Sequence, residues 1–244
     1  QEDDVFIPLS LIEQCSSKLL ELDDADGMQF VSLGVDVARF GDDETIIYRN
    51  YHGHCKIVRN RRGQNLMATV GDIVQEFKKI YREHPTYESK VYVQIDDTGL
   101  GGGVTDRLKE VRKEQKLYKM QVIPINAAEK IETDTAAGKD AAERYNNLTT
   151  AMWASMRDLL DNKQIVIEDD EQTIGQLSSR KYTMASNGKL EIESKKEMKK
   201  RGLDSPDRAD ALALALYLGK IKKHTGSAPS VGAMQKLSKD NYWG

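Results

Sequence analysis

The chain of 244 residues has only two cysteines, Cys15 and Cys55, and no Cys-x-x-Cys pair. Two thiols at this spacing make neither a disulfide framework nor a zinc site, so we expect free thiols in a reducing compartment. No stretch approaches the roughly 20 apolar residues that a bilayer span needs, and the first residues lack a signal-peptide pattern. With 31% charged residues, the composition predicts a soluble globular protein without a membrane partner.

A large excess of charge of one sign is missing as well. The formal net charge is −3, which argues against a protein that is basic over its whole surface. The charges are uneven, however, because residues 178–201 include eight basic and three acidic side chains. A local basic face of this kind can hold a phosphate backbone, although a solvated surface explains the same charges equally well.

The sequence also lacks a P-loop, because Gly138 and Lys139 are followed by Asp140 rather than by Ser or Thr. A P-loop ATPase core is therefore excluded. The glycine-rich segment 99–103 is compatible with a loop that cradles phosphate at a helix N-terminus. It is equally compatible with a flexible turn between a strand and a helix.

Apolar periodicity and turn residues predict the order of secondary structure. The expected strands span residues 30–37, 44–50, 54–60, 90–95, 121–125 and 164–167. The expected helices span residues 66–81, 104–117 and 139–161. This order predicts an α/β domain with a mixed sheet, in which an antiparallel meander precedes right-handed parallel crossovers.

Two further turn signals lie late in the chain. Asn187-Gly188 predicts a β-hairpin between residues 180–184 and 189–192. Ser205 as N-cap and Pro206 as first helical residue predict a last helix that ends near Gly219.

Composition divides the chain into three parts. Residues 1–28 are rich in Asp and Glu around one amphipathic stretch, and we expect a linker or docking helix there. Residues 29–222 form the expected domain, and small and polar residues predict a flexible tail at 223–244.

The first functional hypothesis comes from acidic residues at predicted strand ends. Asp36 ends the first strand, and Asp96 and Asp97 end the fourth. Ligands of open α/β sheets gather at the carboxyl ends of strands, so we expect these side chains at one edge of the sheet. A carboxylate that merely caps a strand is the alternative.

The last predicted helix carries two more carboxylates, Asp207 and Asp210, which share a face because they are three residues apart. Asp207 also suits the positive end of the helix dipole. Asp210 precedes an Ala/Leu run that must pack on the sheet, so it is the stronger candidate. Gathered carboxylates repel one another unless cations bind them. The pattern therefore predicts a divalent-metal site.

Taken together, five segments resemble the nuclease domain of the large terminase subunit of tailed bacteriophages. The likeness covers about residues 30–220 and depends on the order and spacing of the motifs. The segments are 34–45 (GVDVARFGDDET), 96–103 (DDTGLGGG), the stretch around Met152 and Trp153, 194–202 (SKKEMKKRG) and 205–211 (SPDRADA).

The resemblance implies an RNase H-like (RuvC-like) fold with an auxiliary β-hairpin beside the active-site groove. It also implies an endonuclease that cleaves concatemeric viral double-stranded DNA during genome packaging, with two Mg²⁺ or Mn²⁺ ions. The catalytic positions carry over onto Asp36, Asp96 and Asp210. Asp207 and Asp42 match acidic positions that help to hold a second metal, and Asp97 is a register alternative to Asp96.

The basic segment supplies the expected contacts to DNA phosphates: Lys195, Lys196, Lys199, Lys200, Arg201, Arg180 and Lys181. The family also implies an ATPase motor domain in the full-length chain, with a small terminase subunit and a portal ring as partners. The implied location is the host cytoplasm.

Other interpretations stay open at this point. Actin-like and sugar-kinase ATPases place a similar Asp-containing hairpin and glycine loop around ATP phosphates, although they need two lobes. Junction resolvases and transposases share the RNase H-like chemistry. An inert module that docks on a portal ring leaves the acidic segments unexplained.

Overall fold

The structure is a computed structural model that describes residues 4–17, 20–22, 28–38, 43–127, 129–134, 136–217 and 219. The strands are β1 Val31–Asp36, β2 Thr45–Tyr51, β3 His54–Arg61, β4 Val91–Asp96, β5 Met120–Ile125, β6 Val166–Ile167, β7 Tyr182–Met184 and β8 Leu190–Ile192. The helices are α1 Leu9–Gln14, α2 Leu66–Glu83, α3 Gly101–Glu114, α4 Ala136–Arg144, α5 Leu148–Asp161, α6 Glu171–Ser179, α7 Lys195–Lys200 and α8 Asp207–Leu216. Asp42 and the segment 223–244 lie outside the described residues.

Six strands form a mixed sheet in the order β5-β4-β1-β2-β3-β6. The β1, β2 and β3 strands pair antiparallel as a meander, while β4 pairs parallel to both β1 and β5. The β7 and β8 strands make a separate hairpin. The predicted α/β class, the mixed sheet and the auxiliary hairpin are therefore confirmed.

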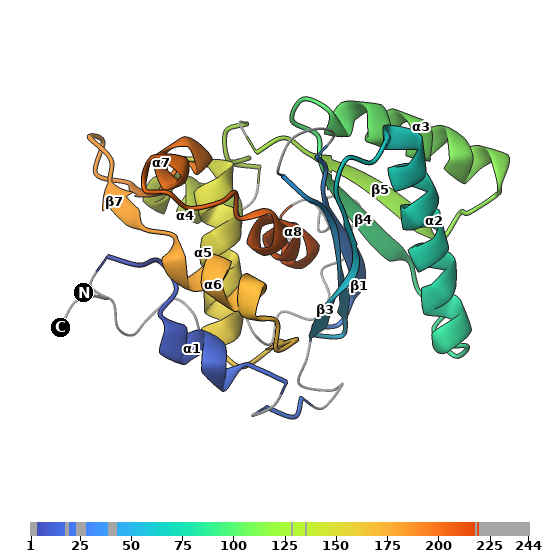
Figure 1. Cartoon of the computed structure of the whole chain (residues 1–244), viewed down its shortest axis with the longest axis horizontal. Helices are drawn as coiled ribbons and strands as arrows, with labels where there is room; N and C mark the ends of the chain where they lie inside the picture. Colours follow the sequence, from blue (N-terminus) through green and yellow to red (C-terminus); the bar gives the residue numbers. More distant parts are fainter. Residues whose placement is uncertain are drawn as a thin grey trace.

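Helices cover both faces of the sheet (Figure 1). On one face, α2 and α3 bury an apolar cluster against residues such as Val31, Leu33 and Val35 of β1. On the other face, α8 lies against the sheet and α5 packs on α8. Because successive strand residues point to opposite faces, Gly34 and Asp36 face α8.

The backbone of α8 approaches β1 closely because both sides are small. A Cβ atom on Gly34 would lie 2.0 Å from the carbonyl oxygen of Ala211 and 2.3 Å from the amide nitrogen of Ala215. The Ser32 hydroxyl and the Gln94 amide also donate hydrogen bonds to the last carbonyls of α8, at 2.5 Å to Ala215 and 2.6 Å to Leu214. These contacts fix where the N-terminal turn of α8 lies above the strand ends.

The segment before the sheet contributes to the core. Phe6, Ile7, Ile12 and Cys15 are buried and belong to the apolar cluster on the α8 side, and α1 contacts α5 and α6. None of the described helices combines the length and the apolar character that crossing a bilayer requires.

The structure corrects three predictions of secondary structure. The expected helix at 139–161 is two helices, because the amide of Asn146 donates to the carbonyl of Leu190 and the Asn147 side chain caps α5 by accepting from the Thr150 amide. The short helices α6 and α7 were not predicted. Finally, α8 begins at Asp207 with Pro206 as its N-cap residue, and no side chain caps it.

Because α8 lies so close to Gly34, one added methyl group at this position should lower the stability of the protein strongly. We expect Gly34→Ala to lower the free energy of unfolding by about 2 kcal/mol or more, since backbone atoms of α8 must move to admit the new Cβ. Urea unfolding followed by circular dichroism measures the change.

The matched control is Gly71→Ala in the interior of α2, where a Cβ meets nothing within 4 Å. This variant should gain about 0.5–1 kcal/mol from helix propensity. Equal unfolding midpoints for wild type and Gly34→Ala would disprove the tight contact.

Candidate active site

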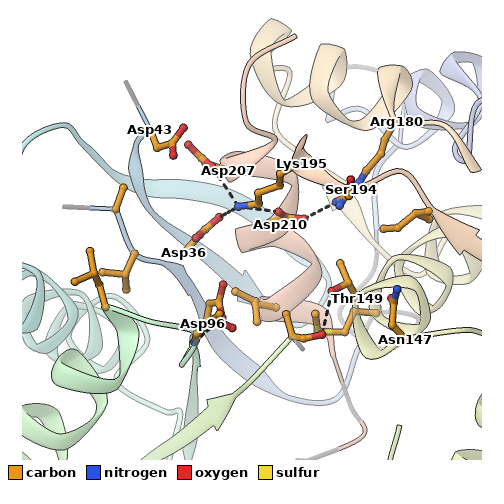
Figure 2. Close-up of a pocket in the computed structure, with 18 of the residues that line it drawn as sticks. Asp36, Asp43, Asp96, Asn147, Thr149, Arg180, Ser194, Lys195, Asp207 and Asp210 are labelled. Atoms are coloured by element: carbon orange, nitrogen blue, oxygen red, sulfur yellow. Dashed lines mark hydrogen bonds and ion pairs between the residues drawn. The ribbon is translucent and has the colours of Figure 1, made fainter. Parts of the chain in front are cut away.

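A pocket of about 780 Å³ opens at the carboxyl ends of β1 and β4. Its acidic wall comes from the ends of both strands and from the first turn of α8. The opposite wall comes from the N-terminus of α5 and from the β8 strand with the residues that follow it. Figure 2 shows Asp36, Asp207 and Asp210 grouped around Lys195, with Asp96 below them.

Asp36 ends β1 and is only 6% exposed. It points toward α8 because the alternation along β1 places it on the same face as Gly34. Burial raises the pKa of Asp36 to about 7; Lys195 opposes this shift, and the carboxylates of Asp210, Asp207 and Asp96 add to it. An acid with this pKa changes its charge near neutral pH.

The first turn of α8 supplies Asp207 and Asp210. The backbone amide of Glu44 donates to one oxygen of Asp207 at 2.8 Å. Oδ1 of Asp210 accepts from the Trp153 indole and from the Arg180 guanidinium, each at 2.8 Å. Although burial opposes ionisation, Lys195 and Arg180 hold the pKa of Asp210 below its usual value.

Lys195 begins α7 directly after its N-cap residue, Ser194. Its Nζ atom lies 3.2 Å from Asp36, 3.1 Å from Asp210 and 3.5 Å from Asp207. Burial alone would lower the pKa of Lys195, but the three carboxylates raise it well above its usual value. The ammonium group therefore marks the place where these carboxylates hold a positive charge.

Asp96 and Asp97 have different surroundings. The parallel register pairs Val35 with Ile95, so the next residues, Asp36 and Asp96, end neighbouring strands at the same edge. Asp96 lines the pocket and accepts a hydrogen bond from the amide of Thr98. Asp97 instead lies near the N-terminus of α3, close to Gly102.

The carboxylates share the pocket without forming a ready-made metal cage. Among the described residues, no three His, Cys, Asp or Glu side chains are arranged so that they could hold a metal ion. Instead, the ammonium of Lys195 lies among Asp36, Asp207 and Asp210. A metal ion at this position requires the lysine to withdraw.

The residues expected to contact DNA divide into two groups. Arg180 is a correction: it is 2% exposed and pairs with Asp210, so it offers no surface charge. Acidic partners also engage four others, which are Lys195, Lys181 with Asp4, Lys199 with Asp43, and Arg201 with Glu193. Lys196 and Lys200 are exposed on α7.

The sequence did not reveal that Trp153 and Arg180 support Asp210 or that the Glu44 amide supports Asp207. The only signal was the presence of Trp153 in a segment that carried the resemblance. Its partner on α8 lies 57 residues later in the chain, and no periodicity connects positions so far apart.

Comparison with solved structures places this geometry in a known fold. The nuclease domain of the large terminase subunit gp2 of bacterial virus Sf6 is similar over 87% of this chain and 98% of that chain, with a TM-score of 0.66 and 18% identity. The chain shares the fold of this terminase nuclease domain. The predicted RNase H-like fold is thereby confirmed.

Two structures of a lysine-to-alanine variant of the Sf6 domain are similar to the same degree. The one with calcium has a TM-score of 0.65 and 18% identity, and the one with manganese has a TM-score of 0.64 and 17% identity. Each covers 87% of this chain and 99% of the Sf6 chain. No family model and no curated protein matches this sequence.

The raised pKa of Asp36 predicts how the metal-free protein responds to pH. The folded-state value of about 7 lies above the ordinary value near 4. The folded chain therefore binds more protons than the unfolded chain between these pH values, and stability falls as pH rises through them. Asp36→Asn removes this loss. In EDTA we expect the variant to exceed wild type by up to about 4 kcal/mol at pH 8 and by far less at pH 4.

Urea unfolding at both pH values measures this difference. Asp106→Asn on α3 is the control, because its carboxylate is 82% exposed, and it should change stability little at either pH. A gain for Asp36→Asn that is the same at pH 4 and pH 8 would contradict the raised pKa.

Proposed function

We propose that this chain is a metal-dependent endonuclease that cleaves concatemeric viral double-stranded DNA during genome packaging, by two-metal hydrolysis of the phosphodiester bond. The observation that carries the proposal is the position of Lys195 Nζ, within 3.1–3.5 Å of three carboxylates at the strand ends. This is a cation position built by the fold. The similarity to the Sf6 terminase nuclease domain supports the same conclusion.

The donor atoms suit Mg²⁺ or Mn²⁺. Carboxylate oxygens are the ligands that these hard cations prefer, and Asp36, Asp96 and Asp210 are the proposed ligands, with Asp207 in support. When bound, such metals polarise the scissile phosphate and lower the pKa of the attacking water. The similar Sf6 structures include one with calcium and one with manganese, which favours a divalent cation here.

The residues of the chain have distinct tasks in this proposal. Asp36 loses its carboxyl proton near neutral pH and then presents a negatively charged carboxylate to the cation position. Asp210 is already ionised. Lys195 would have to leave these carboxylates for a divalent cation to bind there, and its ammonium would then be available to a DNA phosphate.

The surroundings of the pocket suit a DNA duplex. The exposed side chains of Lys196 and Lys200 follow Lys195 on α7, and the β7–β8 hairpin projects beside α7 (Figure 1). We propose that these elements contact the phosphate backbone. In packaging, the chain would act with an ATPase motor domain, a small terminase subunit and a portal ring in the host cytoplasm.

The fold favours a nuclease over the ATP-binding alternative. Actin-like and sugar-kinase proteins bind ATP between two lobes, whereas here Asp36 and Asp96 end strands of one mixed sheet and α8 packs on that same sheet. The glycine loop at residues 99–103 is also part of a compact strand-to-helix connection, in which a Cβ on Gly101 would meet the Asp96 carbonyl at 1.6 Å. Close packing therefore explains this glycine without a nucleotide.

The proposal predicts that each candidate ligand is essential. We expect Asp36→Asn, Asp96→Asn and Asp210→Asn to abolish nicking and linearisation of supercoiled plasmid in Mn²⁺, since each removes a charged ligand, while circular dichroism shows a folded protein. Asp106→Asn is the control and should cleave like wild type. Unchanged cleavage by Asp36→Asn would remove this residue from the site.

The basic face makes a separate prediction about binding. Replacing Lys196 and Lys200 together with Gln should reduce the slope of log affinity against log salt by up to about 2, because each phosphate contact contributes nearly one unit. Fluorescence anisotropy with labelled duplex DNA and Ca²⁺ in place of Mn²⁺ measures the slope. The control combines Lys109→Gln and Lys113→Gln on α3, which covers the face of the sheet opposite to α8. An unchanged slope for the α7 variant would exclude this contact.

A further inference from the structure

The two oxygens of Asp210 are used differently. Oδ1 accepts hydrogen bonds from the Trp153 indole and the Arg180 guanidinium, each at 2.8 Å. Oδ2 lies 3.1 Å from the ammonium of Lys195. In Figure 2, Arg180 and Lys195 lie on opposite sides of Asp210. One oxygen therefore belongs to the protein interior and the other to the cation position.

The two donors to Oδ1 are held rigidly by their own contacts. Trp153 lies in the middle of α5 and is fully buried. The Arg180 guanidinium stacks on the Trp153 ring at 4.6 Å, and its Nε atom donates to the Glu193 carbonyl at 2.9 Å. Because the indole has one polar hydrogen and the guanidinium is planar, neither donor can follow Asp210 into another rotamer.

We propose that Trp153 and Arg180 are positioning residues, which hold Oδ1 of Asp210 and thereby aim Oδ2 at the cation position. This inference rests on the proposed metal-dependent function and assigns a role that the acidic residues alone do not reveal. Partners of metal-ligating carboxylates commonly set ligand orientation, and their loss weakens metal affinity about 10–100-fold.

Asp207, which lies three residues before Asp210 on α8, is held in a similar way. The Glu44 amide holds its Oδ2 at 2.8 Å, and its Oδ1 faces Lys195 at 3.5 Å. Both carboxylates of the helix thus have one oxygen fixed from behind. Trp153 and Arg180 differ from the Glu44 amide because they are side chains, so substitution can test them.

The positive charge of Arg180 and its hydrogen bond to Asp210 have opposite effects on cation binding. Removing its positive charge alone would strengthen cation binding by reducing repulsion, whereas losing the hydrogen bond would weaken binding by freeing the carboxylate. Trp153 is neutral, so Trp153→Phe removes the N–H group and keeps an aromatic ring without changing the charge. Arg180→Lys keeps the charge and cannot hold both Asp210 and the Glu193 carbonyl in the same geometry.

The test is a Mn²⁺ titration followed by electron paramagnetic resonance, which reports free Mn²⁺ independently of cleavage. We expect Trp153→Phe to weaken Mn²⁺ affinity at least about 10-fold, Arg180→Lys to weaken it several-fold, and the double variant to lose less than the product of the two. Arg49→Lys is the matched control, because Arg49 is also a buried arginine paired with a carboxylate, that of Glu83, and it does not line the pocket. Its Mn²⁺ affinity should equal that of wild type.

Thermal unfolding without metal accompanies each titration. If Trp153→Phe and Arg180→Lys lower only the melting temperature and leave Mn²⁺ affinity unchanged, the two residues are structural and the inference fails. If Trp153→Phe does not fold, the comparison of Arg180→Lys with Arg49→Lys decides the question. Asp210→Asn tests the metal site separately from the positioning roles of Trp153 and Arg180, since retained Mn²⁺ affinity in that variant would overturn the proposed site itself.

Trp153 also provides a spectroscopic signal. The chain has two tryptophans, so Trp243→Phe leaves Trp153 as the only indole. We expect paramagnetic Mn²⁺ to quench its emission and Asp210→Asn to abolish the quenching. Absence of quenching under conditions where wild type binds Mn²⁺ would place the metal away from Oδ2 and would contradict the proposal.

Discussion

The contact between α8 and β1 determines the rest of the site. Gly34 lets the backbone at Ala211 and Ala215 lie directly on the strand, and hydrogen bonds from Ser32 and Gln94 fix the far end of the helix. A helix held this close projects its first turn over the end of the strand. Asp207 and Asp210 therefore meet Asp36, although more than 170 residues separate them along the chain. A larger residue at position 34 would lift the helix and open the carboxylate group.

This packing has an electrostatic cost, which the protein offsets with its own lysine. Three carboxylates gathered at one place would repel one another strongly, and Lys195 supplies a positive charge among them. Even so, the pKa of Asp36 stays near 7, whereas Asp210, supported by Lys195 and Arg180, stays ionised. The pocket thus holds more negative charge than its lysine neutralises, and a divalent cation relieves this imbalance better than an ammonium does.

The sequence predicted the parts of this arrangement that follow from strand ends and helix faces. Asp36 and Asp96 end strands that are parallel neighbours in the sheet, and the Ala/Leu run after Asp210 indicated a helix packed on the sheet. It did not predict that Arg180 turns inward, because a count of charges does not say which side chains reach solvent. The break in the helix expected at 139–161 depends on the Leu190 carbonyl in the distant hairpin. Tertiary contacts of this kind leave no periodic signal.

The most direct test of the account is a crystal structure of the protein soaked in Mn²⁺, with anomalous scattering used to locate the metal. The account predicts a manganese peak among the carboxylates of Asp36, Asp96 and Asp210. Lys195 Nζ should have moved away from its present position, and the Trp153 indole should still donate its hydrogen bond to Oδ1 of Asp210. A structure that binds Mn²⁺ elsewhere, or that leaves Lys195 between Asp36 and Asp210 at saturating Mn²⁺, would contradict it.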